Sequence, residues 1–160
     1  MRQAGVIVLA LVLALGAAAC GGGGSGSGDR LSKSEYQDQM RAIGSDLQDA
    51  SASVDISTTT DLDKVADAVG AFQTELESAA NKVDDLNPPA DAEEETDKIA
   101  DALHAFADEF GKMEKAARAK DKPALQEAQQ AVITEGAAAQ QAANDLKAKG
   151  YDIGELGPSG

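Results

Sequence analysis

Two side chains that commonly carry chemistry occur once each in the 160-residue chain, the thiol of Cys20 and the imidazole of His104. A lone cysteine cannot form an intramolecular disulfide, and no Cys-x-x-Cys-His haem attachment motif is present. Asp97, Asp101 and Asp108 share a helical face with His104, a spacing that could bind a metal or make an acid–base pair. What Cys20 and His104 can do depends on the element that positions each of them.

The surroundings of Cys20 are typical of a cleaved and acylated cysteine. Residues 6–15 form an unbroken apolar run behind the single charge of Arg2, and this run is too short to cross a membrane as a helix. Three alanines then lead to Cys20, a pattern that resembles the lipobox of bacterial lipoproteins. The resemblance implies cleavage before Cys20 and diacylglycerol on its sulfur. Ala17 stands where that family usually has Leu, so a plain secreted protein cut after Ala19 by an ordinary signal peptidase is the alternative.

The residues after Cys20 predict a flexible connection. Residues 21–28 are Gly and Ser only, a composition that behaves as random coil with a reach of about 16 Å for eight residues. We therefore assign residues 1–19 to a lipoprotein signal peptide and residues 20–29 to the lipidated cysteine and its Gly/Ser tether.

The charge balance restricts the partners of the protein. The chain carries 28 acidic and 14 basic residues, and loss of Arg2 with the signal peptide would leave a formal net charge of −15. Such an acidic surface argues against nucleic acid as a partner and against lying flat on anionic lipid.

Apolar residues recur every three or four positions over four stretches, a pattern that predicts helices and excludes strands. The four stripes are Tyr36, Met40, Ile43, Leu47, Ala50 and Val54; Leu62, Val65, Val69, Phe72, Leu76, Ala79, Val83 and Leu86; Ala92, Thr96, Ile99, Leu103, Phe106, Phe110, Met113 and Ala117; and Leu125, Ala128, Val132, Gly136, Ala139, Ala143 and Leu146. Because the breaks at residues 55–61, 87–90 and 119–122 are short, consecutive helices should be antiparallel. The predicted fold is all-α, an antiparallel up-down-up-down four-helix bundle over residues 30–154, with a frayed tail at 155–160.

Cap residues mark where these helices begin. Ser32 with Glu35, and Thr60 with Asp63, have the spacing of capping boxes. Asp121 precedes a proline and is the expected cap of the last helix.

The last helix has the weakest pattern. The step from Val132 to Gly136 interrupts the alternation of threes and fours and reads as a stutter. The alanines around it predict close packing against the phenylalanines of the other helices. The same small residues could instead leave a gap beside Phe72 and Phe110.

The predicted faces argue against a catalytic site. The core stripe through Ile99 and Leu103 turns His104 and its neighbouring aspartates toward solvent. One histidine excludes a ferritin-like di-iron site, and no serine has a nucleophile-elbow context. The acidic clusters at residues 84–85 and 93–95 could gather Ca²⁺ weakly but lack EF-hand spacing. We predict no enzymatic activity and no catalytic, metal or cofactor-binding residue.

Taken whole, the chain resembles the small helical lipoproteins of actinobacteria. The matching features are the signal with a Gly-rich stretch after Cys20, the opening LSKSEY at residues 31–36, the LNPP at 86–89 and the Gly150-Tyr151 ending. The resemblance implies a place in the cell envelope and a helical bundle, and it implies no activity.

Two functions are compatible with these observations. The first, which we prefer from the sequence, is a non-enzymatic interaction module on the outer face of the cytoplasmic membrane. It would be held there by lipid on Cys20 and would present a helix face to an envelope protein or wall polymer. The alternative is a carrier or sensor of a small apolar ligand held within the bundle.

The anchor can be tested by Cys20→Ser. Removal of the acylated sulfur should release the protein into the medium, because nothing else predicted in the chain holds it to lipid. Immunoblots of membrane and medium fractions measure this. A variant that stays in the membrane fraction would show that Cys20 is not the anchor.

Overall fold

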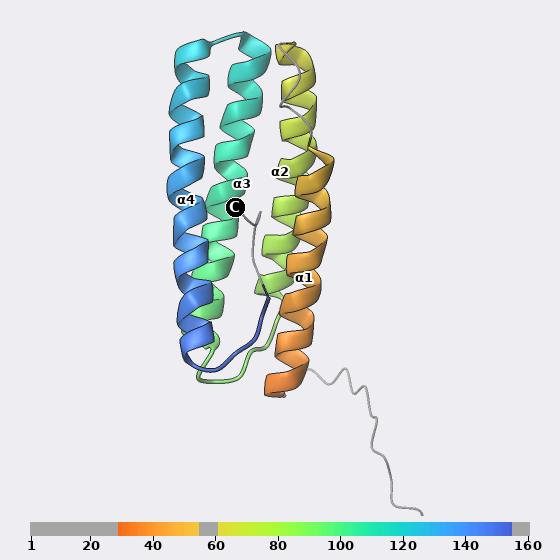
Figure 1. The fold of residues 1–160 in the computed structure, drawn as a ribbon, viewed down its shortest axis with the longest axis vertical. Coiled ribbons are helices and arrows are strands. Elements are labelled where there is room, and N and C mark those ends of the chain that lie inside the picture. The colour runs from red at the N-terminus through yellow and green to blue at the C-terminus, as the bar shows by residue number, and fades with distance from the viewer. Residues whose placement is uncertain (1–28, 55–60, 155–160) are drawn as a thin grey trace, which may run out of the picture.

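Four antiparallel helices make up the part of the chain that the computed structural model describes, residues 29–54 and 61–154 (Figure 1). They are α1 (Lys33–Ser53), α2 (Leu62–Asp84), α3 (Glu93–Ala119) and α4 (Lys122–Ala148). The predicted all-α four-helix bundle is therefore confirmed. The predicted signal peptide, Cys20, the tether as far as residue 28 and the tail at 155–160 lie outside the described residues.

Helices α1, α2 and α4 begin at side-chain caps, two of which the sequence predicts, whereas α3 has no side-chain cap. The Ser32–Glu35 capping box forms, and Asp121 accepts a hydrogen bond from the Ala124 backbone N–H at 3.2 Å. The capping box expected at Thr60 is wrong, because the N-cap of α2 is Asp61, whose carboxylate accepts from the Asp63 backbone N–H at 3.1 Å. Aspartate caps a helix better than threonine, so the helix begins one residue later.

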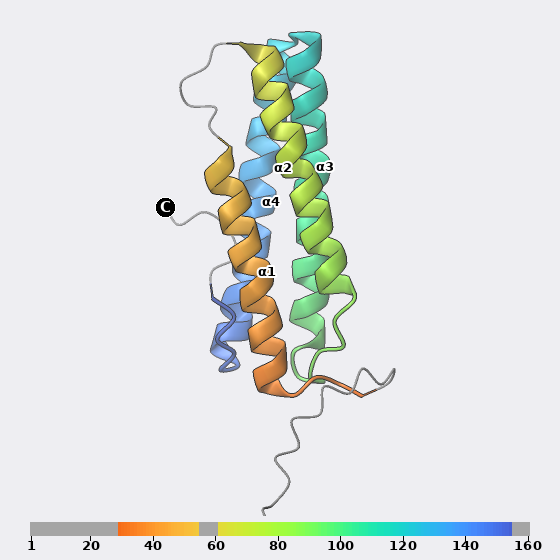
Figure 2. The same cartoon turned by 90° about the vertical axis from the view of Figure 1, so that its right-hand side faces the viewer.

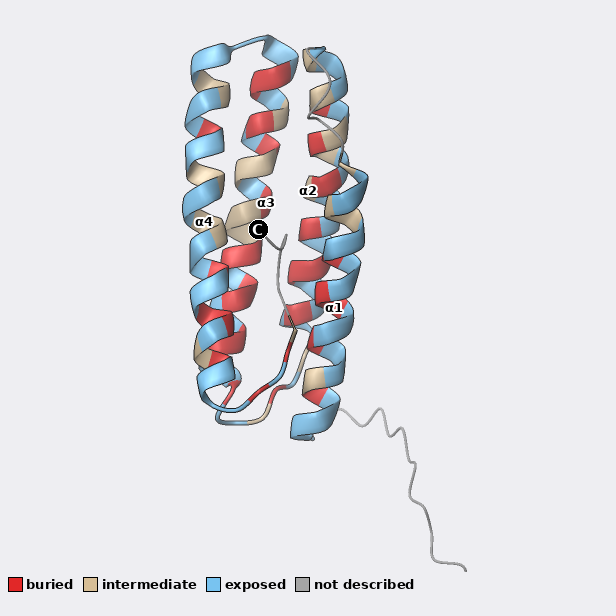
Figure 3. Cartoon of the chain, viewed as in Figure 1, coloured by how far each residue is buried: buried red, intermediate tan, exposed pale blue. Residues whose placement is uncertain are grey.

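The buried faces follow the predicted stripes, and each helix turns its apolar side inward (Figure 3). One correction concerns α3, where Phe106 and Phe110 are only partly buried at the edge of the core. The Thr96 hydroxyl donates to the Ala92 carbonyl, one turn back along the chain, at 2.8 Å. The Tyr36 hydroxyl then donates to the Thr96 oxygen, also at 2.8 Å, which joins α1 to α3 through a buried pair.

The helices do not close into a complete ring. α1 packs on α2, α2 on α3 and α3 on α4, but no Cα atom of α1 lies within 8 Å of one in α4. We call the space between α1 and α4 the seam. α4 ends in a left-handed Gly150 with φ of 83°, and the Tyr151 N–H donates back to the Leu146 carbonyl at 3.0 Å. This turn sends the following residues into the seam (Figures 1 and 2).

Residues 151–153, the seam segment, fill one end of the seam. The Tyr151 ring meets the Tyr36 ring edge-on with centroids 5.5 Å apart, and its hydroxyl donates to Asp91 at 2.7 Å. Ile153 is fully buried in the main core cluster. The Asp152 backbone N–H donates to the Gln37 side chain at 3.2 Å. The seam segment therefore joins α1 to the rest of the bundle where α4 does not reach it.

α1 is also too short to cover the whole bundle. Its 21 residues span about 32 Å, against about 40 Å for the 27 residues of α3 or α4. At the end where α2 begins, the core is a small cluster of Val69, Met113 and Ala128 built by the other three helices. Figure 1 shows that α1 stops short of this end.

Ile133 and Ile153 allow a matched test of the seam segment. Ile153→Ala should lower the free energy of unfolding by about 2–5 kcal/mol, because it empties a fully buried site. Ile133→Ala removes the same atoms from a side chain that is 66% exposed. This variant should change the free energy of unfolding by no more than about 0.5 kcal/mol. Chemical denaturation of both variants measures this, and equal effects would mean that Ile153 is not held in the seam.

Candidate functional site

Beyond the seam segment the seam stays open as an apolar cleft of about 310 Å³. All four helices contribute to its walls. The lining residues are Leu47, Ser51, Phe72, Leu76, Leu103, Phe106, Val132, Ile133, Gly136, Ala139 and Gln140. Small-molecule pockets begin at about this volume and are lined mainly by apolar side chains.

The cleft exists because one wall has small residues where the opposite wall has rings. Gly136 and Ala139 of α4 face the cleft, and a Cβ atom added to Gly136 would lie 3.6 Å from the Phe106 ring. The three phenylalanines of the chain form a series of edge-on contacts, Phe72 to Phe110 and Phe110 to Phe106, each with centroids 5.0 Å apart. These contacts hold the Phe72 and Phe106 rings in the cleft wall rather than in its interior. From the stutter at Gly136, the sequence analysis offered either close packing or a gap beside Phe72 and Phe110; Phe72 lines the cleft, whereas Phe110 does not.

Over residues 29–54 and 61–154, no charged residue lines the apolar cleft. Its two polar side chains are Ser51 and Gln140, and both use a donor within their own helix. The Ser51 hydroxyl donates to the Gln48 carbonyl at 2.8 Å, and the Gln140 amide contacts Asn144 at 3.5 Å. Ile133 is the one large apolar side chain among the described residues that is markedly exposed, and it lies in the cleft lining.

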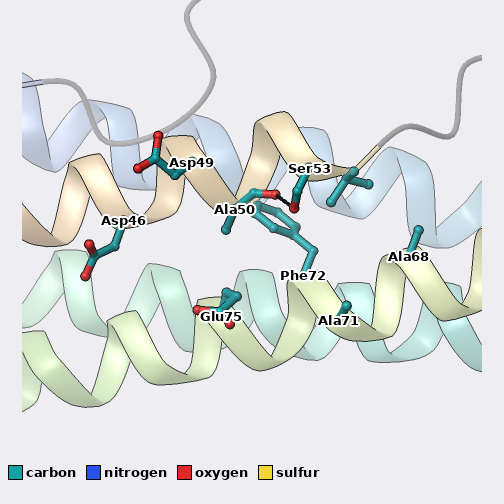
Figure 4. A pocket seen from close by; sticks show the side chains of 9 residues that line it. Asp46, Asp49, Ala50, Ser53, Ala68, Ala71, Phe72 and Glu75 are labelled. Carbon is teal, nitrogen blue, oxygen red and sulfur yellow. Dashed lines mark hydrogen bonds between the residues drawn. The ribbon is translucent and has the colours of Figure 1, made fainter.

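An acidic groove of about 420 Å³ lies between α1 and α2 (Figure 4). Asp46 and Asp49 come from α1 and Glu75 comes from α2, with the Phe72 ring between the two helices. Phe72 lines both hollows, so this ring separates the acidic groove from the apolar cleft. Asp46 forms an ion pair with Lys82 at 2.7 Å.

The side chains that the sequence offered for metal or acid–base chemistry are not brought together. His104 is half exposed and pairs with Asp84 of α2 at 2.7 Å, rather than with the aspartates of its own helix. Each carboxylate of the cluster at 93–95 has its own cation: Glu93 pairs with Arg30, Glu94 with Lys98 and Glu95 with Lys149. Over residues 29–54 and 61–154, no three His, Cys, Asp or Glu side chains are arranged to hold a metal ion.

Sequence reasoning missed one buried charge. Glu95 is almost fully buried and pairs with Lys149, whose ammonium also donates to the Asp91 carbonyl at 2.8 Å. An acidic residue is favoured in the first turn of α3 because the N-terminal end of the helix dipole is positive. The burial of Glu95 has another cause, which is the approach of the end of α4. This pair closes the end of the bundle beside the seam segment and does not touch the cleft.

The seam segment also carries a phenol with a shifted pKa. Burial raises the pKa of Tyr151 to about 12, and the hydrogen bond to Asp91 adds to this shift. The same bond lowers the pKa of Asp91, with nearby Lys33 and Lys149 contributing. The Tyr151–Asp91 pair is therefore stable with the phenol protonated and the carboxylate ionised.

Comparison of the chain with protein-family models, with curated proteins and with solved structures finds no match. None of the helices in the described part has the length and apolarity needed to span a membrane. The interpretation of the cleft therefore depends on its own residues.

The Tyr151–Asp91 pair predicts a stability loss at alkaline pH. Because the folded pKa of Tyr151 lies near 12 and the usual value is 10, its contribution is complete below pH 10 and is lost as the pH rises to about 12. The difference in free energy of unfolding between the wild type and Tyr151→Phe should therefore shrink over that range. Denaturation at a series of pH values measures it, and a difference that does not change with pH would contradict the buried, protonated phenol.

Proposed function

We propose that this protein is an extracytoplasmic lipoprotein that binds a small apolar molecule in the cleft between α1 and α4. The observation that carries the proposal is the cleft itself, about 310 Å³ with walls from four helices and no charged lining residue. Protein interiors are packed as densely as organic crystals, so the apolar side chains that line an empty cleft lack packing contacts on one side. A bound apolar molecule would supply the missing contacts.

Gly136 supports a binding role over a mere packing defect. A glycine inside a helix costs up to about 1 kcal/mol relative to alanine. Here an alanine would fit, because its Cβ would make an ordinary contact with Phe106 at 3.6 Å and the helix geometry is regular. The glycine therefore solves no steric problem of the folded protein. What it does is widen the cleft.

The place of action follows from the predicted anchor. With lipid on Cys20 and a Gly/Ser tether, the bundle would stand on the outer face of the cytoplasmic membrane. Arg30, where the described chain begins its path into α1, donates to the Pro88 carbonyl at 2.9 Å at the base of the bundle. Ser51 of the cleft lies on α1 about 28 Å above this base. A ligand in the cleft would thus be held away from the bilayer, as suits a carrier or a sensor.

A second candidate is the non-enzymatic interaction module of the cell envelope, without a ligand. The acidic groove between α1 and α2 favours it, since three carboxylates beside Phe72 would suit a basic protein segment or a cationic wall polymer. The exposed apolar patch that this function predicts is limited, in the described residues, to Ile133 at the cleft rim. For this reason we place ligand binding first.

Binding can be tested with N-phenyl-1-naphthylamine, an uncharged fluorescent probe, and the purified full-length protein. Gly136→Leu places a side chain into the cleft and should weaken saturable binding at least about tenfold. The matched control is Ala137→Leu, which adds the same group to the exposed neighbouring position of α4 and should leave the affinity unchanged. Gly136→Ala, which fits without strain, should give an intermediate loss and guards against misfolding of the leucine variant.

Two results would contradict the proposal. One is the absence of saturable probe binding to the wild-type protein. The other is equal affinity of the wild type and Gly136→Leu, which would place the probe elsewhere on the molecule. Thermal unfolding of each variant confirms that the compared proteins are folded.

A further inference from the structure

The apolar cleft is distinguished by what its mouth lacks. Proteins that bind carboxylates or phosphates place a cation or several N–H donors at the ligand's charged end. Here the polar side chains of the lining are Ser51 and Gln140, and each already donates within its own helix. Ile133, also in the lining, is uncharged as well. An anionic end of a ligand would meet no counter-charge among the described residues that line the cleft.

Charges elsewhere in the molecule further disfavour an anionic ligand. The chain has a formal net charge of −14, so its overall field repels an anion. The acidic groove lies directly across Phe72 from the cleft, with Asp46, Asp49 and Glu75 around it. A charged group that leaves water also pays a large desolvation penalty unless it is paired. A neutral hydroxyl or carbonyl pays far less and can be met by the Gln140 amide or by water at the mouth.

We propose that the ligand of the cleft is an uncharged amphiphile, an alkyl or prenyl chain that ends in a hydroxyl or other neutral polar group, and not a fatty acid or a phosphorylated lipid. The inference rests on the proposed function and specifies its ligand class. The apolar chain lies in the cleft along the surface that Phe72, Phe106 and Gly136 line, and the neutral end lies at the mouth near Gln140. Selection is made by the missing cation rather than by a dedicated binding group.

Three ligands with the same chain and different ends test the inference. Decan-1-ol, decyltrimethylammonium and decanoate are each used to displace N-phenyl-1-naphthylamine from the full-length protein at neutral pH. Decan-1-ol should bind at least about tenfold more tightly than decanoate. The affinity of decyltrimethylammonium should lie between those of the other two ligands. The net negative charge of the protein attracts this cation, but its charged group must still be desolvated. Displacement that persists in Gly136→Leu is subtracted, since it does not come from the cleft.

A charge added at the mouth provides the converse test. Gln140→Lys should strengthen decanoate binding about threefold or more, the range expected for an exposed ion pair, and should therefore reduce the preference for decan-1-ol over decanoate. The matched control is Gln126→Lys, an exposed position about 21 Å away along α4, where salt screens the added charge from the cleft. Only Gln140→Lys should change the preference for decan-1-ol over decanoate.

The outcomes distinguish failure of this inference from failure of the proposed function on which it rests. If the probe itself shows no Gly136-dependent binding, the proposed function fails. If the probe binds in the cleft but decanoate displaces it as well as decan-1-ol does, ligand binding stands and the inference about charge is wrong. The inference is also wrong if Gln126→Lys and Gln140→Lys raise the affinity for decanoate equally.

Discussion

The seam segment, residues 151–153, is the constraint on which the rest of this structure depends. In a closed four-helix bundle the first and last helices pack directly on each other. Here Tyr151 and Ile153 enter that position after the left-handed turn at Gly150, and they contact α1 through Tyr36 and Gln37. Because these residues fill only one end of the seam, α1 and α4 stay apart beyond it. The cleft is the consequence of a partly filled space between two helices.

This arrangement divides the molecule into parts with different tasks. The end that holds Tyr151, Glu95 and the Tyr36–Thr96 pair is closed by buried polar contacts between α1, α3 and the end of α4. The middle is wide and apolar, and Phe72 separates it from the acidic groove. The closed end lies where α1 begins, and the open middle lies farther along α1. The proposed ligand class follows from the same division, since every charge in the neighbourhood lies outside the cleft.

The helices could be read from the sequence because periodicity is a local property. The stripe from Val69 to Val83 and the Ser32–Glu35 box needed only neighbours in the chain, and both predictions are confirmed. The polar pairs could not be read, because Glu95 meets Lys149 and Asp84 meets His104 only once the helices have a definite register. The cleft could be predicted only in part. The stutter at Gly136 located it, but the short α1 and the path of the seam segment decided that the gap stays open.

The most direct test of this account is a crystal structure of the protein equilibrated with xenon, which enters apolar cavities that water avoids. The account predicts xenon density in the apolar cleft that Phe72, Phe106 and Gly136 line, with the seam segment in place and α1 separated from α4. A structure in which α1 packs directly against α4, with the Phe106 ring filling the space and no xenon between them, would contradict it.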